Sequence, residues 1–480
     1  MSWRHSHPSA RWWALGVLSM TQLVVVLDST IVNIALPQAQ AELGLTDSAR
    51  QWVVTAYALA FGAFLLLGGR IADYAGRKLA YMIGMVGFGV ASAYGGLVSS
   101  GVDLIIARAL QGVFAALLAP AALALLTVTF PHGRERNRAF AVFGTVAGAG
   151  AATGLVLGGF LTEFADWRWC LLVNLIFVLI GVIAGAIVLS PSKAEGENRY
   201  DVAGAVTITL GLGALVYGFS LAENGWADPL TIMFLAAGVI LLAAFVWIES
   251  RVAQPLLPLR VIADRVRGGA LIVQALSGSV MIGTTLYLTF HLQIVLGMSA
   301  LAAGVASLPL PFAITATAPL VTRLLPKTGP RPLMTLGPIL AGIALFYLSL
   351  ISPTGSYWVE VFPGLLLMGV GMGFIFVPLQ NVALMGVAPH EAGAASAAVN
   401  SAMQIGGSIG LSVFTTIYVS VLAGVTGAPT AGELTAAYGA TFQAAAIGML
   451  AAALIAVAMI RRRTDETVAE AAVATRVPLG

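Results

Sequence analysis

The run WWALGVLSMTQLVVVLDSTIVNIA at residues 12–35 is apolar and exceeds the roughly 20 residues that a helix needs to cross a bilayer. It carries one acidic residue, Asp28, and no other long apolar run of the chain holds a carboxylate away from its ends. A charged side chain at that depth costs about 2.5–3.5 kcal/mol on insertion scales and usually marks a proton or ion pathway. Asp28 is therefore the first candidate functional residue.

The composition places the chain in a lipid environment. Of its 480 residues 59% are hydrophobic and 9% are charged, whereas a soluble domain carries about 25% charged residues. The 24 Lys and Arg residues are scattered through short loops instead of forming one basic patch, so the sequence does not predict a nucleic-acid partner. The one cysteine, Cys170, excludes an intramolecular disulfide and is expected to be a small buried side chain.

Fourteen apolar runs of membrane-spanning length divide the sequence. They lie at 12–35, 51–69, 79–98, 104–128, 138–162, 168–189, 202–221, 230–248, 269–292, 302–325, 332–351, 360–387, 395–422 and 440–460. The chain is thus predicted to be an all-α membrane protein, and an even number of spans puts both termini on one side. Nearly all Lys and Arg residues fall on that side, whereas Arg50 and Arg168 fall on the other. The positive-inside rule then predicts a multi-pass cell-membrane protein with both termini in the cytoplasm.

A faint internal repeat runs through the spans. Arg70 and Gly76 recur as Arg323 and Gly329 at one 253-residue offset, and further landmarks repeat in order at a nearby offset. Two pseudo-repeated bundles of six helices, separated by two additional helices, fit this pattern. Repeated halves of this kind build a site between two rocking bundles in many secondary transporters. The 6+2+6 plan comprises a cytoplasmic N-terminus at 1–11, a six-helix bundle at 12–190, two extra helices at 200–250, a second bundle at 268–462 and a tail at 463–480 that is expected to be disordered.

Several motifs occur in a characteristic order. They are LDSTIVNIALP at 27–37, GGRIADYAGRK at 68–78, RALQGVFAALLAP at 108–120, a glycine-rich fifth span, DWRW at 166–169, YDVAG at 200–204 and PLLPL at 255–259. Together they resemble the signatures of the major facilitator superfamily, and most closely its fourteen-span branch of drug:proton antiporters. The resemblance covers almost the whole chain. It implies a monomeric exporter of small hydrophobic or cationic compounds, often antibiotics, that works in exchange for protons.

The charged segment between the second and third runs is expected to be a cytoplasmic gating loop. It contains Gly69, Arg70, Asp73, Gly76, Arg77 and Lys78. In such a loop Asp73 can accept from backbone donors or pair with an arginine across the seam between the halves, while the two glycines allow the turn and close approach. The resemblance favours this latch over a basic loop that merely sets topology. The second half has Pro326 at the position of Asp73, so the latch is expected to be asymmetric.

Asp28 and Arg108 are predicted to lie at one depth. With a rise of 1.5 Å per residue, each is about 7 Å from the outer edge of a 30 Å hydrocarbon core. In the fold that the chain resembles, spans one and four both line the central cavity, so an ion pair or a water-bridged pair is feasible. The hypothesis is that Asp28 carries the proton and Arg108 holds the deprotonated acid. A static pair that only fixes the two spans is the alternative, and the repeat offers no second acid because Met281 occupies the related position.

Polar and aromatic side chains on several spans are candidates for the substrate cavity, where a few polar groups in an apolar wall orient a ligand. They are Thr30, Asn33, Tyr57, Phe61, Gln111, Gln274, Tyr287, Asn381, Asn400 and Gln404, with Gln293 as a further polar point. Tyr57 and Phe61, one turn apart, could stack on an aromatic or cationic compound. Hydrogen bonding between helices is the alternative for each polar residue.

Glycines at four-residue spacing in the fifth run predict tight packing against a neighbouring helix. They are Gly144, Gly148, Gly150, Gly154, Gly158 and Gly159. Antiporters of the family usually carry a Gly-Pro step here, but this chain has Leu155 after Gly154. Because proline kinks a helix, the fifth span is expected to be straighter, which puts strict antiport in some doubt.

Other functions are less consistent with the sequence. A facilitator that moves a metabolite by uniport or symport, without coupling through Asp28, is the main alternative. The sequence lacks an HExxH motif, a Walker-type glycine loop and a paired-carboxylate site, so neither an enzyme nor a metal or nucleotide cofactor is predicted. Transport would then use the proton gradient as its energy source.

Overall fold

The computed structural model describes residues 10–130, 133–193, 201–222, 225–252, 255–257, 259–385 and 392–460. All regular structure in these residues is helical, and fourteen helices are long and apolar enough to cross a membrane, as predicted. The predicted tail 463–480 and most of the N-terminal segment 1–11 lie outside the described residues.

The first half of the chain contains α2 (Ala10–Leu43), α3 (Asp47–Ala75), α4 (Arg77–Gly96), α5 (Gly101–Thr129), α6 (Gly133–Phe164), α7 (Trp169–Leu172) and α8 (Asn174–Val188). The additional helices are α9 (Val202–Leu221) and α10 (Pro229–Glu249). The second half contains α11 (Leu259–Ile262), α12 (Arg265–Phe290), α13 (Ala300–Ala306), α14 (Pro309–Thr328), α15 (Pro330–Leu348), α16 (Phe362–Leu384), α17 (Ala392–Leu422) and α18 (Ala431–Met459), with π-helical turns at His291–Val295 and Tyr357–Val361.

Most helices extend beyond the apolar runs that predicted them. The first span was expected to end near residue 35 but continues to Leu43, and the last begins at Ala431 instead of residue 440. Thr430 starts α18 with a capping box, because its side chain accepts from the backbone N–H of Glu433 while Glu433 accepts from that of Thr430. Hydropathy detects the stretch inside lipid, whereas caps determine where a helix begins.

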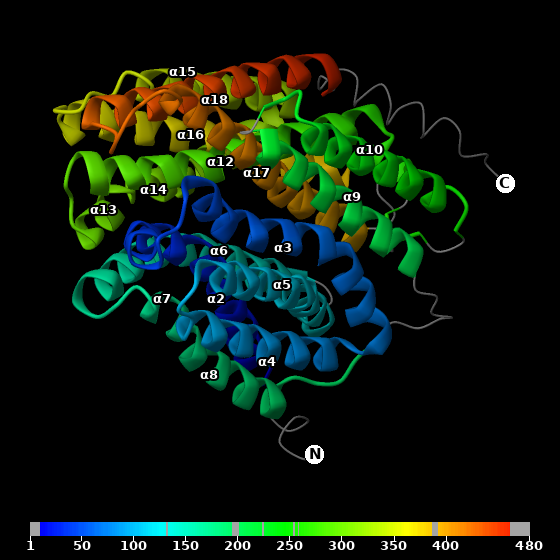
Figure 1. The fold of residues 1–480 in the computed structure, drawn as a ribbon. Helices are drawn as coiled ribbons and strands as arrows, with labels where there is room; N and C mark the ends of the chain where they lie inside the picture. Colours follow the sequence, from blue (N-terminus) through cyan, green and yellow to red (C-terminus); the bar gives the residue numbers. More distant parts are fainter. Residues whose placement is uncertain are drawn as a thin grey trace.

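Two groups of helices lie side by side (Figure 1): α2 to α8 below, and α12 to α18 above. Helices α3 and α17 join the groups through polar contacts. The Gln51 amide donates to the Ser412 hydroxyl at 2.6 Å, and the Ser401 hydroxyl donates to the carbonyl of Gly62 at 2.9 Å. These contacts fix α3 of the first half against α17 of the second. The boundaries of the 6+2+6 plan stay a prediction.

The additional pair, α9 and α10, is attached to both groups. The indole N–H of Trp52 in α3 donates to the hydroxyl of Ser220, and the hydroxyl of Thr416 in α17 donates to the carbonyl of Phe219. Both acceptors belong to α9. A relative movement of α3 and α17 therefore has to be accommodated by this pair.

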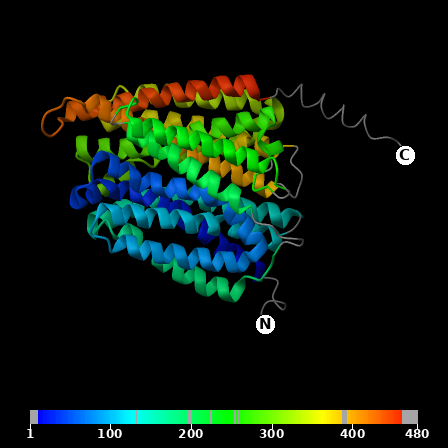
Figure 2. The ribbon, with the colours of Figure 1, turned by 45° about the vertical axis from the view of Figure 1, so that its right-hand side comes forward.

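The start of α2 and the end of α18 lie at the same end of the bundle (Figure 2). We call this the terminal end and the other the opposite end. Since successive spans alternate in direction, Asp47 and the last turns of α2, α12 and α17 lie at the opposite end, while Gly76 lies at the terminal end.

Helix α6 diverges from the second half toward the terminal end. Near the opposite end a Cβ on Gly159 would lie 2.6 Å from the carbonyl oxygen of Ala300, and one on Gly304 would lie 2.3 Å from that of Leu155. A Cβ on Gly148 would lie 3.7 Å from its nearest neighbour, the Thr315 hydroxyl. A Cβ on Gly144 would have no neighbour within 4 Å. The two halves are thus in backbone contact at the opposite end and separate along α6 toward the terminal end.

Candidate functional site

Asp28 and Arg108 form an ion pair in the interior of the first half. Arg108 Nη1 lies 2.6 Å from Asp28 Oδ2, and the side chains are 2% and 0% exposed. Asp28 is the nineteenth residue of α2, and Arg108 is in the third turn of α5. Breaking such a buried pair by removing one partner costs about 3–5 kcal/mol, since the remaining charge is left uncompensated.

Two amides complete the shell around the carboxylate. Gln111 Nε2 and Asn174 Nδ2 donate to Asp28 Oδ1 at 2.9 and 2.7 Å. Gln111 Oε1 in turn accepts from Arg108 Nη1 at 2.7 Å, and Gln111 Nε2 also donates to the Ser92 hydroxyl at 2.8 Å. Because Arg108 and Gln111 are three residues apart, both side chains lie on one face of α5.

The aromatic ring of Tyr57 covers the cation. The guanidinium carbon of Arg108 lies 4.4 Å from the ring centroid, and Arg108 Nε donates to the carbonyl of Val53 at 3.3 Å. The Tyr57 hydroxyl donates to the carbonyl of Val25, and the Phe61 ring packs 5.9 Å from the Tyr57 ring. Since Arg108 already covers a face of Tyr57, that face is not open to a substrate in this conformation.

The Asp28 network therefore consists of Asp28, Tyr57, Ser92, Arg108, Gln111 and Asn174, which come from α2, α3, α4, α5 and α8. Its net charge is zero when Asp28 is ionised. Its three donors, one of them charged, offset part of the cost of burying the carboxylate. Protonation would remove its attraction for Arg108 and leave the guanidinium without its counter-ion, which would weaken the contact between α2 and α5.

Sequence reasoning did not find Asn174 or Ser92. Asn174 is the single amide in the sixth apolar run, WCLLVNLIFVL at residues 169–179, and it follows the start of that run by about the same distance as Arg108 follows the start of the fourth. The depth argument that paired Asp28 with Arg108 would have selected it. Ser92 gives no comparable signal, because small hydroxyl residues are common in membrane helices.

Most of the other predicted cavity residues lie apart from this network. Thr30 and Asn33 bond to carbonyls within α2, and Asn381 and Asn400 are exposed and bond to carbonyls within α16 and α17. Gln274 is buried in α12, Gln404 packs its Cβ toward Gly62 of α3, and Gln293 donates to the carbonyl of Ile34. Tyr287 bonds to the hydroxyl of Thr415 in the second half. Of the predicted set, the structure gathers only Tyr57, Phe61 and Gln111 around Asp28.

The prediction of a loop at Gly69–Lys78 is wrong. Helix α3 continues through Gly69, Arg70 and Asp73 to Ala75, and only Gly76 separates it from α4, which begins at Arg77. Gly76 has φ of +120°, a conformation that favours glycine. The apolar run ended at the first charged residues, but these residues form the last turns of a helix that projects past the apolar layer.

The expected pairing of Asp73 across the two halves is also not seen. Asp73 Oδ1 accepts from Nε and Nη2 of Arg77 at 3.0 and 2.8 Å, within the same hairpin. Arg70 does not pair with Asp73, and its Nη2 donates to the carbonyl of Pro255 at 2.7 Å. Lys78 donates to the carbonyls of Ala186 and Leu189 at the end of α8. These bonds tie the α3–α4 hairpin to α8 and to the segment after α10.

The glycines of α6 divide between two neighbours. A Cβ on Gly150, Gly154 or Gly158 would lie about 3 Å or less from α2, at Leu23, Thr30 and Ile31, while Gly159 faces α13 of the other half. Gly148 differs from the expectation, since its nearest neighbour would be 3.7 Å away. Leu155 takes the place of the expected proline, and α6 runs without interruption from Gly133 to Phe164.

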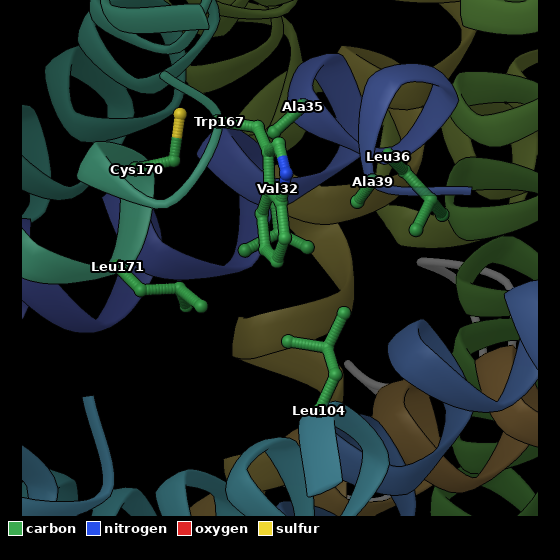
Figure 3. Close-up of a pocket in the computed structure, with 8 residues that line it drawn as sticks. All are labelled: Val32, Ala35, Leu36, Ala39, Leu104, Trp167, Cys170 and Leu171. Carbon is green, nitrogen blue, oxygen red and sulfur yellow. The ribbon is translucent and has the colours of Figure 1, made fainter. Parts of the chain in front are cut away.

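A small cavity between α2, α5 and α7 lies toward the opposite end from the network (Figure 3). Its lining is Val32, Ala35, Leu36, Ala39, Leu104, Trp167, Cys170 and Leu171. These side chains leave no polar group to orient a ligand, so we regard it as a packing gap. Cys170 is fully buried there, and its thiol lies 3.3 Å from the Thr162 hydroxyl.

The profile of the Major Facilitator Superfamily matches residues 18–411. The chain belongs to this superfamily. As a member it is a multi-pass membrane transporter and not an enzyme. It is 46% identical over 410 residues to the puromycin resistance protein pur8 of Streptomyces alboniger, with 85% of this chain and 82% of that protein covered.

Two further relatives in the superfamily match over nearly their whole length. The cephamycin export protein CmcT of Amycolatopsis lactamdurans is 36% identical, covering 94% of this chain and 93% of that protein. The lincomycin resistance protein of Streptomyces lincolnensis is 34% identical, covering 94% and 92%. A crystal structure of the peptide transporter POT in complex with sulfate superposes with a TM-score of 0.66 at 16% identity, covering 95% of this chain and 94% of that one. The last match shows a shared fold only.

Proposed function

We propose that this protein exports hydrophobic or cationic antibiotics across the cell membrane by alternating access, in exchange for protons, with Asp28 as the proton carrier. The names of three relatives support antibiotics as substrates, since they refer to puromycin resistance, cephamycin export and lincomycin resistance. Puromycin is the first compound to test because that relative is 46% identical. The transporter acts as a monomer and needs no cofactor besides the proton gradient.

The observation that carries the proton-coupling role is the buried Asp28 network. Its carboxylate is the one acid of the described spans far from a helix end, and it contacts three donors on α5 and α8. In the proposed cycle this conformation holds the deprotonated acid. After the protein has opened to the outside and released its substrate, a proton from outside neutralises Asp28 and releases Arg108, which loosens α2 from α5 and lets the halves return.

The direction of transport rests on the divergence of α6. The halves are in contact at the opposite end, where Gly159 and Gly304 lie against backbone, and α6 separates from the second half toward the terminal end. With both termini in the cytoplasm, as the distribution of Lys and Arg predicts, this conformation receives substrate from the cytoplasm. The exposed amides of Asn381 and Asn400 lie on helices of the second half that extend to this end.

Puromycin accumulation in inside-out membrane vesicles tests the proposal. The unaltered protein should accumulate puromycin when a proton gradient is present and stop when nigericin and valinomycin collapse it. Asp28→Asn should abolish uphill accumulation. Asp228→Asn is the matched control, because Asp228 caps α10 at its start and asparagine caps equally well. Puromycin entry that only equilibrates across the membrane and does not respond to the proton gradient would instead favour a facilitator that is not coupled through Asp28.

A further inference from the structure

Arg50 is a buried cation at the opposite end of the bundle, about two turns before Tyr57 on α3 and outside the Asp28 network. It belongs to the first turn of α3 and is 2% exposed. Its guanidinium carbon lies 4.2 Å from the ring centroid of Phe290, 5.3 Å from that of Tyr418 and 6.0 Å from that of Tyr287. We call these three rings the aromatic cage. The ring of Tyr438 stacks on Tyr418 behind it, with centroids 5.6 Å apart.

The partners of Arg50 divide between the two halves. Its ionic and hydrogen-bonding partners belong to the first half, since Nη1 lies 2.9 Å from Asp47 Oδ1 and donates to Gln40 Oε1 at 3.3 Å. The aromatic cage belongs entirely to α12 and α17 of the second half. If the halves separate at this end, Arg50 keeps Asp47 and Gln40 and is rehydrated, while the aromatic cage is vacated.

The ring faces of the aromatic cage attract positive charge, and this attraction does not require hydrogen bonds from the cation. Nε and Nη2 of Arg50 are buried and have no acceptor in hydrogen-bonding geometry, although the Tyr418 hydroxyl is close enough to interact with the guanidinium. The Tyr287 hydroxyl is engaged with Thr415 at 2.7 Å. A cation that has no N–H group would therefore lose little by taking the place of the guanidinium, and aromatic cages bind quaternary ammonium groups in this way.

We propose that the aromatic cage of Tyr287, Phe290 and Tyr418 is an exit-side binding site for quaternary or otherwise delocalised organic cations. Arg50 occupies it when the opposite end is closed, and the exported cation occupies it when that end is open. Closure returns Arg50 to the cage and displaces the cation, which gives release a direction. The inference rests on the proposed function in that it assumes alternating access and cationic substrates, but it does not depend on proton coupling through Asp28.

Equilibrium dialysis of radiolabelled choline against the full-length protein in maltoside micelles tests the site. Arg50→Ala should increase choline affinity about tenfold. This factor applies if Arg50 occupies the aromatic cage in about nine tenths of the unaltered molecules and in none of the variant. Phe290→Leu in the Arg50→Ala background should remove most of this gain. 3,3-Dimethylbutanol, the neutral carbon isostere of choline, should fail to compete, because ring faces attract the charge.

Arg168→Ala is the matched control. Arg168 is the other arginine predicted on this side and also lies over a ring, 4.5 Å from the centroid of Trp167, but its partners are Glu42 and the carbonyl of Val98 in the first half. The Arg168→Ala substitution should leave choline affinity unchanged. Arg50→Gln, which keeps an amide beside Asp47, serves as a second vacating variant should Arg50→Ala not fold.

Equal choline affinity in the unaltered protein and both Arg50 variants would overturn the site, as would an undiminished gain in the Phe290→Leu double variant. An equal gain in Arg168→Ala or equal competition by 3,3-dimethylbutanol would do the same. Because binding is measured at one pH without a gradient, its failure leaves proton-coupled efflux intact. Loss of proton coupling in the efflux assay likewise leaves the choline result standing.

Discussion

Replacing Arg108 by Gln should destabilise the protein far more than replacing Arg108 and Asp28 together. In Arg108→Gln, the fully buried Asp28 carboxylate loses its counter-ion and the donor 2.6 Å from Oδ2, while Gln111 and Asn174 still donate to Oδ1. Since two donors remain, the cost should fall near 3 kcal/mol, the lower end of the range for a broken buried pair. Arg108→Gln with Asp28→Asn removes both charges and should recover about 2 kcal/mol of this loss.

The single buried cysteine supplies the assay. Cys170 is fully buried, so a fluorogenic maleimide reacts with it only when the surrounding helices open. Reaction rates against temperature in detergent give the stability of the unaltered protein, both single variants and the double variant. The contact between Arg108 and the Tyr57 ring is lost in both variants that lack Arg108, so it cancels in the cycle. Additive effects of the two substitutions would refute the ion pair.

Three further changes test neighbouring parts of the structure. Asn174→Ala should destabilise by about 1–2 kcal/mol, less than Arg108→Gln, because Asp28 keeps its counter-ion Arg108, and the same maleimide assay measures the loss. Gly304→Ala should push α13 away from α6, because its Cβ would lie 2.3 Å from the carbonyl oxygen of Leu155. Spin labels on the two helices at the opposite end should then report longer distances, and unchanged distances would contradict the contact. Gly148→Ala is the control and should have no effect, because its Cβ would lie 3.7 Å from the nearest atom. Gly76→Ala should cost about 1–3 kcal/mol because alanine is strained at φ of +120°, and normal thermal stability would show that the hairpin adopts another turn.

The number of spans and the equal depth of Asp28 and Arg108 followed from length and rise, while the expectation that their helices meet came from the resemblance to the superfamily. A membrane helix needs about 20 apolar residues, and the rise per residue places an isolated charge within its span. Both quantities can be counted along the sequence. The ends of α3 could not be predicted in this way, because charged residues such as Arg70 and Asp73 continue the helix beyond the apolar layer.

The surroundings of the pair were harder to predict. Which polar residues meet depends on how each helix is rotated about its axis. In a soluble protein the polar face reveals that rotation, but a membrane helix is apolar toward lipid and toward the protein interior alike. Asn400 and Gln404 therefore seemed equivalent to Gln111, although only Gln111 faces Asp28. The aromatic cage around Arg50 was hidden for the same reason, since Tyr418 lies more than a hundred residues after Tyr287 and Phe290 in the sequence.

Proton movement during puromycin transport tests the role of Asp28 most directly. Proteoliposomes loaded with a pH-sensitive dye would receive puromycin on one side, and the internal pH would be followed together with puromycin uptake. The unaltered protein should move protons opposite to puromycin. Asp28→Asn should still exchange labelled for unlabelled puromycin but move no protons. Proton movement that persists in Asp28→Asn, or that is absent from the unaltered protein while puromycin moves, would contradict the assignment of Asp28 as the proton carrier.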